Sequence, residues 1–388
     1  MSVFAPLVRP QCCQYLVIPS NCNAIMGREH CKMNEGRGFP KEKAIIVIAL
    51  FLLPIFTSTE SAALTVVSKN RGSSPPTVAI LDTAIDTSLP IFTNRILFEA
   101  CITEWYSCPN GSSEMEGGNS ATLPVSWYHS FGLSHGTQMS ALAVLTNPEI
   151  QIVFIRIIGA NSRGIRQITS ETTVERALDW VIRNHKRFGI HAVSMSQGHH
   201  RLGAPGSNYC PRTPITRKKI IELRESEIPV FFPTGNNGDH LRIDWPACIA
   251  ESVAIGSSIQ KNAGADFSNY DPGLIDFFAP GKARVMSVGK RFINISGTSA
   301  STIVAATQWA TIKSIFPTLS YEQIYEVLSD TSTNVESKYT FSGKLINLEG
   351  ALIALNLLAN DEKDYLLSPH DEVKWSDNYK MILERNWS

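Results

Sequence analysis

Three residues of this 388-residue chain have side chains that together could carry out nucleophilic catalysis. Asp82 follows an apolar run, His135 stands in a Ser-His-Gly-Thr segment, and Ser299 closes a Ser-Gly-Thr-Ser segment. A serine hydroxyl is a weak nucleophile at neutral pH, so it needs a neighbouring base that a third group orients. Imidazole can take and return a proton near neutral pH, and a carboxylate can hold its ring in one tautomer. Ser299 is therefore the candidate nucleophile, His135 the base and Asp82 the orienting acid.

A fourth segment could stabilise the negative oxygen that such an attack creates. Residues 233–238 read Pro-Thr-Gly-Asn-Asn-Gly and follow the strand-like residues 228–232. A side-chain amide placed there could donate a hydrogen bond to this oxyanion. Taken singly, each of these short motifs is usually only a loop, and a lone histidine is more often structural. Their occurrence together, each at the end of an expected strand or helix, favours catalysis.

These residues need a scaffold that places them together. Residues 77–81 are apolar and β-rich, which predicts a buried parallel strand ending at Asp82. Open α/β sheets build their sites at the carboxyl ends of such strands. Ser299 lies at the start of a run with helical spacing, so free backbone N–H groups at the helix start could help to hold an oxyanion.

Strand-like and helix-like segments alternate along the chain, which predicts an α/β fold with a doubly wound, mostly parallel sheet. We expect residues 95–126 to form a surface insertion and residues 199–214 to form a long loop beside the site. The expected strands cover residues 77–81, 151–157, 192–195, 230–232 and 253–256. The expected helices cover residues 138–146, 172–184, 218–225, 298–315 and 321–328.

With these residues in view, the chain resembles the subtilisin-like serine proteases, also called subtilases or the peptidase S8 family. The resemblance extends from about Thr77 to about Leu357 and rests first on the chain order Asp, His, Ser. It implies a three-layer fold with helices on both faces of the sheet. Further blocks that are similar to the family pattern lie at residues 193–198, 245–247, 253–256, 266–270, 278–281 and 343–347.

The resemblance implies an exported serine endopeptidase that acts on proteins or peptides through the triad above and an acyl-enzyme. Asn236 rather than Asn237 would be the oxyanion donor, because in the family the asparagine directly follows the glycine. The segment that lines the first specificity pocket would supply three substrate-binding residues, Ser196, Gln197 and Gly198.

The chain departs from the usual family pattern at three places. Ala84 stands where the family usually has glycine, the proline that usually follows the nucleophile is absent, and Gln138 replaces a histidine or small residue. None of these changes removes a catalytic group, so they bear on specificity more than on activity. Two alternatives stay open: a processing peptidase for one precursor or partner, and a non-catalytic binding protein on a subtilase scaffold.

The composition is that of a neutral globular chain. Lys and Arg together number 35, Asp and Glu together also number 35, and 43% of the residues are hydrophobic. This balance argues against an obligate nucleic-acid or anionic membrane partner, and we expect a monomer. The sequence shows neither a glycine-rich phosphate loop nor a metal-binding cysteine motif. We therefore expect no cofactor and no metal site; structural calcium is common in the family, but no carboxylate cluster indicates it here.

The first part of the chain has the pattern of a secretory signal peptide. Lys41 and Lys43 precede the apolar residues 44–56, and small residues at 61 and 63 predict cleavage after Ala63. The apolar run is shorter than the roughly 20 residues of a membrane-spanning helix, although an uncleaved anchor is the alternative. We therefore expect a periplasmic or extracellular protein. The expected parts are an N-terminal extension with the signal peptide (1–63), a peptidase domain (64–358) and a C-terminal tail (359–388).

Two further expectations concern this first part. Met26 and Met33 lie closer to the apolar run than Met1 does, so our hypothesis is that residues 1–32 do not belong to the natural product. Subtilases often carry a large pro-segment that assists folding, and residues 64–76 are too few for one. We therefore expect this protein to fold without a pro-segment.

The cysteines divide between the two parts of the chain. Four lie before residue 64, and four lie in the expected peptidase domain: Cys101, Cys108, Cys210 and Cys248. An even number in an exported protein predicts disulfides, although four cysteines allow three pairings. Cys101 with Cys108 is our first choice because the segment between them has the pattern of a loop. Buried free thiols are the alternative.

Overall fold

A computed structural model describes residues 74–104, 106–128, 133–160, 166, 169–199, 210, 212–260, 263–336 and 342–360. The expected signal peptide, most of the expected loop 199–214 and all but the start of the expected tail lie outside these residues. The expected boundary at 358 falls inside the last helix, α8 (Leu348–Asn360). Within the described ranges, no helix has both the length and the apolar character needed to cross a membrane.

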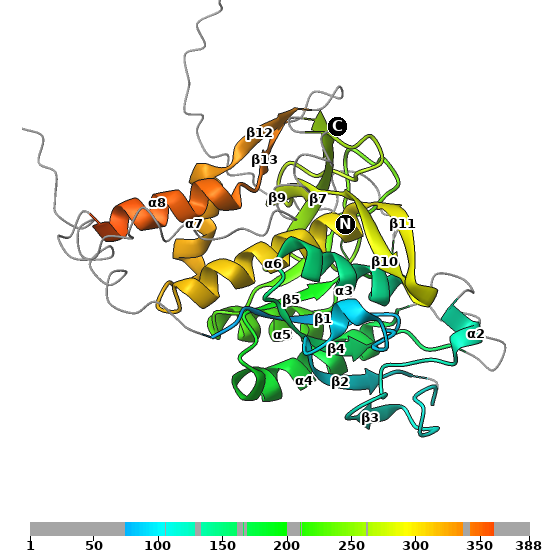
Figure 1. The fold of residues 1–388 in the computed structure, drawn as a ribbon. Coiled ribbons are helices and arrows are strands. Elements are labelled where there is room, and N and C mark those ends of the chain that lie inside the picture. The colour runs from blue at the N-terminus through cyan, green and yellow to red at the C-terminus, as the bar shows by residue number, and fades with distance from the viewer. Residues whose placement is uncertain are drawn as a thin grey trace, which may run out of the picture. The chain divides into compact units, whose positions relative to one another are not determined.

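One large, mostly parallel sheet forms the centre of the described chain (Figure 1). Its eleven strands run in the order β3-β2-β4-β1-β5-β6-β7-β8-β12-β13-β9, and β7 also pairs with β9. A separate hairpin is formed by β10 and β11. The strand bounds are β1 (Thr77–Asp82), β2 (Ile96–Ile102), β3 (Glu114–Glu116), β4 (Gln151–Arg156), β5 (Ala192–Met195), β6 (Val230–Pro233), β7 (Val253–Gln260), β8 (Ala263–Gly264), β9 (Phe277–Pro280), β10 (Lys282–Ser287), β11 (Arg291–Ser296), β12 (Thr333–Glu336) and β13 (Ser342–Leu345).

Helices cover both faces of the sheet, as Figure 1 shows for α4 and α5 (green) on one side and α6 (yellow) on the other. The side chains of β1 alternate between the two layers. Val78 and Ile80 pack into the core shared with α3 and α6, whereas Ala79 and Leu81 pack into the core shared with α4 and α5. The helix bounds are α2 (Val125–Tyr128), α3 (His135–Thr146), α4 (Glu171–Phe188), α5 (Pro214–Glu225), α6 (Thr298–Ile315) and α7 (Tyr321–Thr331), with short 3-10 turns at Pro90–Phe92 and Val288–Lys290.

Helix α6 is buried along almost its whole length, including Trp309, which is fully enclosed. Its sequence is rich in alanine, serine and threonine, and small side chains let the helix lie close to the sheet. Two of its buried hydroxyls are satisfied within the helix: Thr302 donates to the Thr298 carbonyl and Thr311 to the Thr307 carbonyl, each at 2.8 Å. Other polar atoms of the helix, Ser301 Oγ, Thr307 Oγ1 and Trp309 Nε1, are buried without a hydrogen-bond partner among the described residues, so the burial of this helix carries a cost in lost hydrogen bonds.

The five expected strands and five expected helices are all present, and the helix at residues 298–315 has the expected bounds. Helix α4 is longer than expected at both ends because it has a cap at each. The Ser170 hydroxyl accepts the Thr173 N–H at the start, and Gly189 ends the helix in the left-handed region at φ 59°.

The expectation of a surface insertion at residues 95–126 is wrong for its first part. Residues 96–102 form β2, which pairs in parallel with β4 and adds a strand to the central sheet. Glu99 interrupts the apolar pattern of this strand in the sequence. Its side chain is buried and accepts the backbone N–H groups of Asn119 and Ala121. Because the loop that follows supplies these donors, a carboxylate is tolerated inside the strand.

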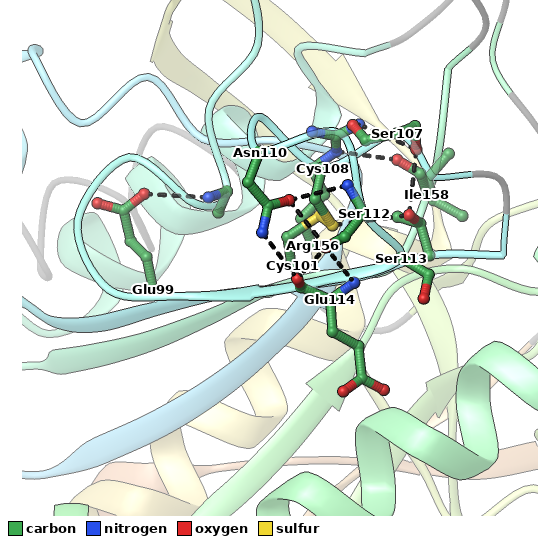
Figure 2. The surroundings of a disulfide bond; sticks show 12 residues. Glu99, Cys101, Ser107, Cys108, Asn110, Ser112, Ser113, Glu114, Arg156 and Ile158 are labelled. Atoms are coloured by element: carbon green, nitrogen blue, oxygen red, sulfur yellow. Dashed lines mark hydrogen bonds between the residues drawn. A yellow bond between two sulfur atoms is a disulfide. The ribbon is translucent and has the colours of Figure 1, made fainter.

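Two disulfides link the four cysteines of the described domain, Cys101 with Cys108 and Cys210 with Cys248. The first pairing is the expected one, and the alternative of free thiols is wrong. Figure 2 shows the first disulfide beside the buried Arg156. This guanidinium donates to the carbonyl oxygens of Ile158 and Ser107 at 3.1 and 2.9 Å. Burial lowers the pKa of Arg156 to about 10, and these carbonyls partly offset the loss of solvent.

The start of β1 is tied to β5 through a histidine. His191 donates its backbone N–H to the Thr77 carbonyl at 2.9 Å, and its ring Nδ1 accepts the Thr77 N–H at 3.0 Å. Only the unprotonated ring nitrogen can accept this hydrogen bond. Burial, together with the charge of Lys313, lowers the pKa of His191 to about 4.

We expect this histidine to make the protein less stable on mild acidification. A histidine in the unfolded chain has a pKa of 6.5 against about 4 here, so the unfolded state binds more protons between these values. The free energy of unfolding should therefore fall as the pH drops from about 6.5 toward 4. Urea unfolding at a series of pH values should show that His191→Gln lacks this part of the slope. Parallel curves for the two proteins would contradict the assignment.

Candidate active site

The three candidate catalytic residues come from separate elements and lie near the carboxyl end of β1, an interior strand of the sheet. Asp82 is the last residue of β1, His135 is the first residue of α3, and Ser299 is the second residue of α6. His135 and Ser299 both line a cavity of about 160 Å³. The structure thus brings together the residues that the sequence predicts to act together.

Asp82 and His135 form a tight pair. The ring Nδ1 lies 2.8 Å from Oδ1 and 2.9 Å from Oδ2 of the carboxylate, and Asp82 is completely buried. The backbone N–H of Thr83 also donates to Oδ1 at 2.6 Å. A carboxylate only accepts, so the proton of a neutral His135 sits on Nδ1 and its Nε2 keeps a free lone pair. This is the tautomer that a general base requires.

A threonine hydroxyl holds the strand end against the helix start. Thr83 Oγ1 donates to the Leu133 carbonyl and accepts the Gly136 N–H, both at 2.9 Å. Gly136 lies so close to the strand that a β-carbon would approach the Ala84 oxygen and the Phe154 ring to 2.6 Å. Ala84, where the family usually has glycine, is fully buried, and the Asp82–His135 contact is intact beside it.

Ser299 lies in the first turn of α6. Its hydroxyl donates to the Ser196 carbonyl at 3.3 Å, and the Ser196 hydroxyl donates back to the Ser299 carbonyl at 3.1 Å. In this rotamer the nucleophile is bound to a backbone oxygen, so proton transfer to His135 requires the hydroxyl to turn toward Nε2. Loose hydrogen bonds of this kind are common in active sites without substrate.

The amide of Asn236 is anchored by its oxygen. Oδ1 accepts the backbone N–H and the hydroxyl of Thr298 at 2.9 and 3.0 Å. This leaves the Nδ2 hydrogens for other partners, and Asn236 lines the same cavity as Ser299. The preceding Gly235 has φ 106°, a conformation that favours glycine, and Asp244 and Asn269 leave no room there for a β-carbon.

The three residues expected to bind substrate all line the cavity, but Gln197 also reaches the acid. Its Nε2 donates to Asp82 Oδ1 at 2.9 Å and lies 3.2 Å from His135 Nδ1. Its Oε1 accepts a hydrogen bond from Arg166. The expectation that Ser196, Gln197 and Gly198 bind substrate stays a prediction, since a pocket wall without a bound peptide does not establish a contact.

Sequence reasoning missed two charged residues of this cavity, Arg166 and Asp244. Asp244 directly precedes the Trp-Pro-Ala block at 245–247, and its Oδ1 accepts the Asn269 amide at 3.0 Å. That block could have drawn attention to it. Arg166 stands outside every motif, so only the folded chain reveals it. Among the described residues, no group of three or more His, Cys, Asp or Glu side chains is placed to hold a metal ion.

Comparison with known proteins agrees with this geometry. A model of the subtilase family matches residues 73–347. Alkaline elastase YaB from Bacillus sp. (strain YaB) is 29% identical over 244 residues, which cover 60% of this chain and 59% of that protein. Subtilisin BL from Lederbergia lenta is 29% identical over 232 residues, which cover 57% of this chain and 78% of that protein.

Solved structures share the fold. Prenylagaramide maturation protease PagA is 20% identical to this chain, with a TM-score of 0.54. The match covers 76% of this chain and 99% of that protein. At this identity the likeness concerns the fold alone. It confirms the expected three-layer α/β architecture.

The close approach of α3 to β1 leads to a prediction for Gly136. In Gly136→Ala the new methyl group would overlap a backbone oxygen, so α3 must move away from the strand and carry His135 with it. We expect a loss of about 1–3 kcal/mol in the free energy of unfolding, typical of overpacking. Chemical denaturation measures it. Gly118→Ala is the matched control, because nothing lies within 4 Å of that position; equal losses in both variants would contradict the prediction.

Proposed function

This chain belongs to the subtilase family, and we propose that it is a serine endopeptidase in which Asp82, His135 and Ser299 form the catalytic triad. The observation that carries the proposal is the 2.8 Å contact between a fully buried carboxylate and an imidazole whose ring shares a cavity with the serine. The curated relatives are named as proteases, and the alignment with alkaline elastase YaB spans 59% of that protein.

The chemistry follows the positions of these groups. Ser299 Oγ attacks the scissile carbonyl while His135 Nε2 takes its proton, and the resulting imidazolium is stabilised by Asp82. His135 then gives the proton to the leaving amine as the peptide bond breaks, which leaves an acyl group on Ser299. A water molecule, deprotonated by the same imidazole, releases the acyl group and regenerates the hydroxyl.

The oxyanion would be held by Asn236 Nδ2 and by the backbone N–H of Ser299. The support for Asn236 is its anchored Oδ1, which sets the direction of the amide before substrate binds. The support for the backbone donor is its place in the first turn of α6, where N–H groups have no partner within the helix. Donors fixed in advance need no reorganisation as the negative charge develops.

A narrow-specificity processing peptidase is the second candidate, and the cavity favours it. Arg166 and Asp244 line the same small cavity as the nucleophile, together with other polar groups. A large apolar side chain would have to bury these charges without replacing their hydrogen bonds, which is unfavourable. A library of peptide substrates distinguishes the candidates, since a broad protease would cleave many sequences and a processing peptidase few.

Export is part of the proposal. Two disulfides in the described chain support it, because disulfides persist in oxidising compartments and are rare in the cytosol. The N-terminal extension with the signal peptide (1–63), the peptidase domain (64–358) and the C-terminal tail (359–388) are proposed on sequence grounds. Sequencing the amino terminus of the mature protein would test the cleavage after Ala63.

We expect the purified protein to react with a fluorophosphonate probe at Ser299. The Ser299 oxygen attacks the phosphorus and displaces fluoride while His135 takes the hydroxyl proton, so a fluorescent adduct forms on the wild type and is absent from Ser299→Ala. Intact mass and gel fluorescence measure the adduct. A folded wild type that gains no adduct would instead favour the binding protein without catalysis.

A second prediction concerns the oxyanion donor. Asn236→Ala should lower kcat by about 100- to 1,000-fold with little change in KM, a magnitude taken from the corresponding change in a subtilisin. Steady-state hydrolysis of a peptide substrate measures it. Asn237→Ala is the matched control, since Asn237 donates its backbone N–H to Asn269 Oδ1 and this substitution keeps that hydrogen bond. Similar losses in both variants would argue against a specific role for Asn236.

A further inference from the structure

We propose that Gln197 is a positioning residue that shares the Asp82 carboxylate with His135, and that Arg166 sets the orientation of the Gln197 amide. The inference rests on the proposed function, because it concerns the readiness of His135 to act as a base. It adds to the triad a hydrogen-bonded chain that runs from Arg166 through Gln197 and Asp82 to His135.

The sheet brings Gln197 to the acid. β5 pairs in parallel with β1, with Met195 opposite Leu81, so the residues that follow the two strands leave the sheet side by side. Gln197 comes two residues after β5 and is only 3% exposed. A glutamine so deeply buried needs partners for both ends of its amide, and it finds them in Arg166 and Asp82.

Arg166 determines which end of the amide faces the acid. A guanidinium has only donors, so the group that it contacts must be the amide oxygen. The nitrogen is then directed at Asp82, where it donates at 2.9 Å. The opposite orientation would place an oxygen against the carboxylate and a donor against Arg166, and both contacts would be repulsive.

Three donors meet at one carboxylate oxygen. Oδ1 of Asp82 accepts from Thr83 N at 2.6 Å, from His135 Nδ1 at 2.8 Å and from Gln197 Nε2 at 2.9 Å. The 3.2 Å approach of Nε2 to Nδ1 is therefore a contact between two donors that share this oxygen. By taking part of the negative charge, Gln197 weakens the hold of Asp82 on a protonated imidazole. The base is then available at lower pH than it would be without this residue.

The other charged groups near the pair have different partners. Arg156 lies opposite Asp82 across the β1–β4 pairing, but its guanidinium donates to backbone carbonyls. Asp86 accepts from the hydroxyl and backbone N–H of Ser88. Asp244 lines the cavity and accepts a hydrogen bond from the Asn269 amide. Among the described residues, only Thr83, His135 and Gln197 donate to the Asp82 carboxylate.

The test is the pH dependence of probe labelling in Gln197→Leu, which removes the donor and keeps a similar bulk. The rate constant for fluorophosphonate labelling should reach half its maximum at a pH higher than in the wild type by about one unit, equivalent to a tenfold change in proton affinity. An NMR titration of the His135 ring should show the same displacement of the half-titration pH toward higher values, without any probe. In Arg166→Leu, where the amide is free to turn over, the displacement should have the same sign and be smaller.

Gln138→Leu is the matched control. Gln138 lies one turn after His135 on α3, but its amide donates to the hydroxyls of Ser134 and Ser287 and makes no contact with Asp82. Its substitution should leave unchanged the midpoint, that is, the pH at which the labelling rate constant is half its maximum. If Gln197→Leu does not fold, Gln197→Met replaces it: the unbranched thioether side chain fills the same space and has no hydrogen to donate to Asp82, so the midpoint should rise as far.

The outcomes separate the two proposals. A wild type that labels, together with Gln197 variants whose midpoint matches the wild type, would overturn the positioning role and leave the proposed function standing. A wild type that does not label would overturn the proposed function, and the NMR titration would then decide the positioning role alone. An equal displacement in Gln138→Leu would show a general effect of packing and would also overturn it.

Discussion

The site depends on a charge that is buried completely at the end of a strand. A buried carboxylate is strongly unfavourable unless donors surround it, and the donors to Asp82 come from Thr83, His135 and Gln197. Only Thr83 is a neighbour in sequence. The parallel pairing of β1 with β5 and the docking of α3 on β1 bring the others within reach. The same contacts that make the charge tolerable therefore also orient the base.

The nucleophile is positioned by packing rather than by a local sequence device. Proline, which could pre-set the start of the helix, is absent from the first turn of α6. Instead the helix is enclosed by the sheet and by the helices beside it, and it satisfies the buried hydroxyls of Thr302 and Thr311 internally. A helix that cannot shift keeps its first turn in a fixed place, between the chain after β5 and the anchored Asn236.

Patterning predicted the elements whose burial is uniform, such as the strand at 192–195 and the helix at 298–315. It failed where polar side chains are buried with local partners. Glu99 interrupts β2 in sequence, yet the loop that follows supplies two N–H donors to it. The hairpin of β10 and β11 was not predicted either, although the residues of β10 alternate between exposed and buried; β11 is mostly exposed. For Glu99 the deciding donors lie 20 and 22 residues further along the chain, outside the window that a periodic pattern covers.

The sequence by itself determined which reactive side chains are available, their order along the chain and the family to which the chain belongs. It also predicted the Cys101–Cys108 disulfide, because the segment between these two cysteines has the pattern of a loop. The tertiary structure alone decided that Gln197 faces Asp82, that Arg166 sets its amide, and that Arg166 and Asp244 enter the cavity. The physical reason is strand register: Gln197 and Asp82 are 115 residues apart, and only the pairing of β5 with β1 makes them neighbours.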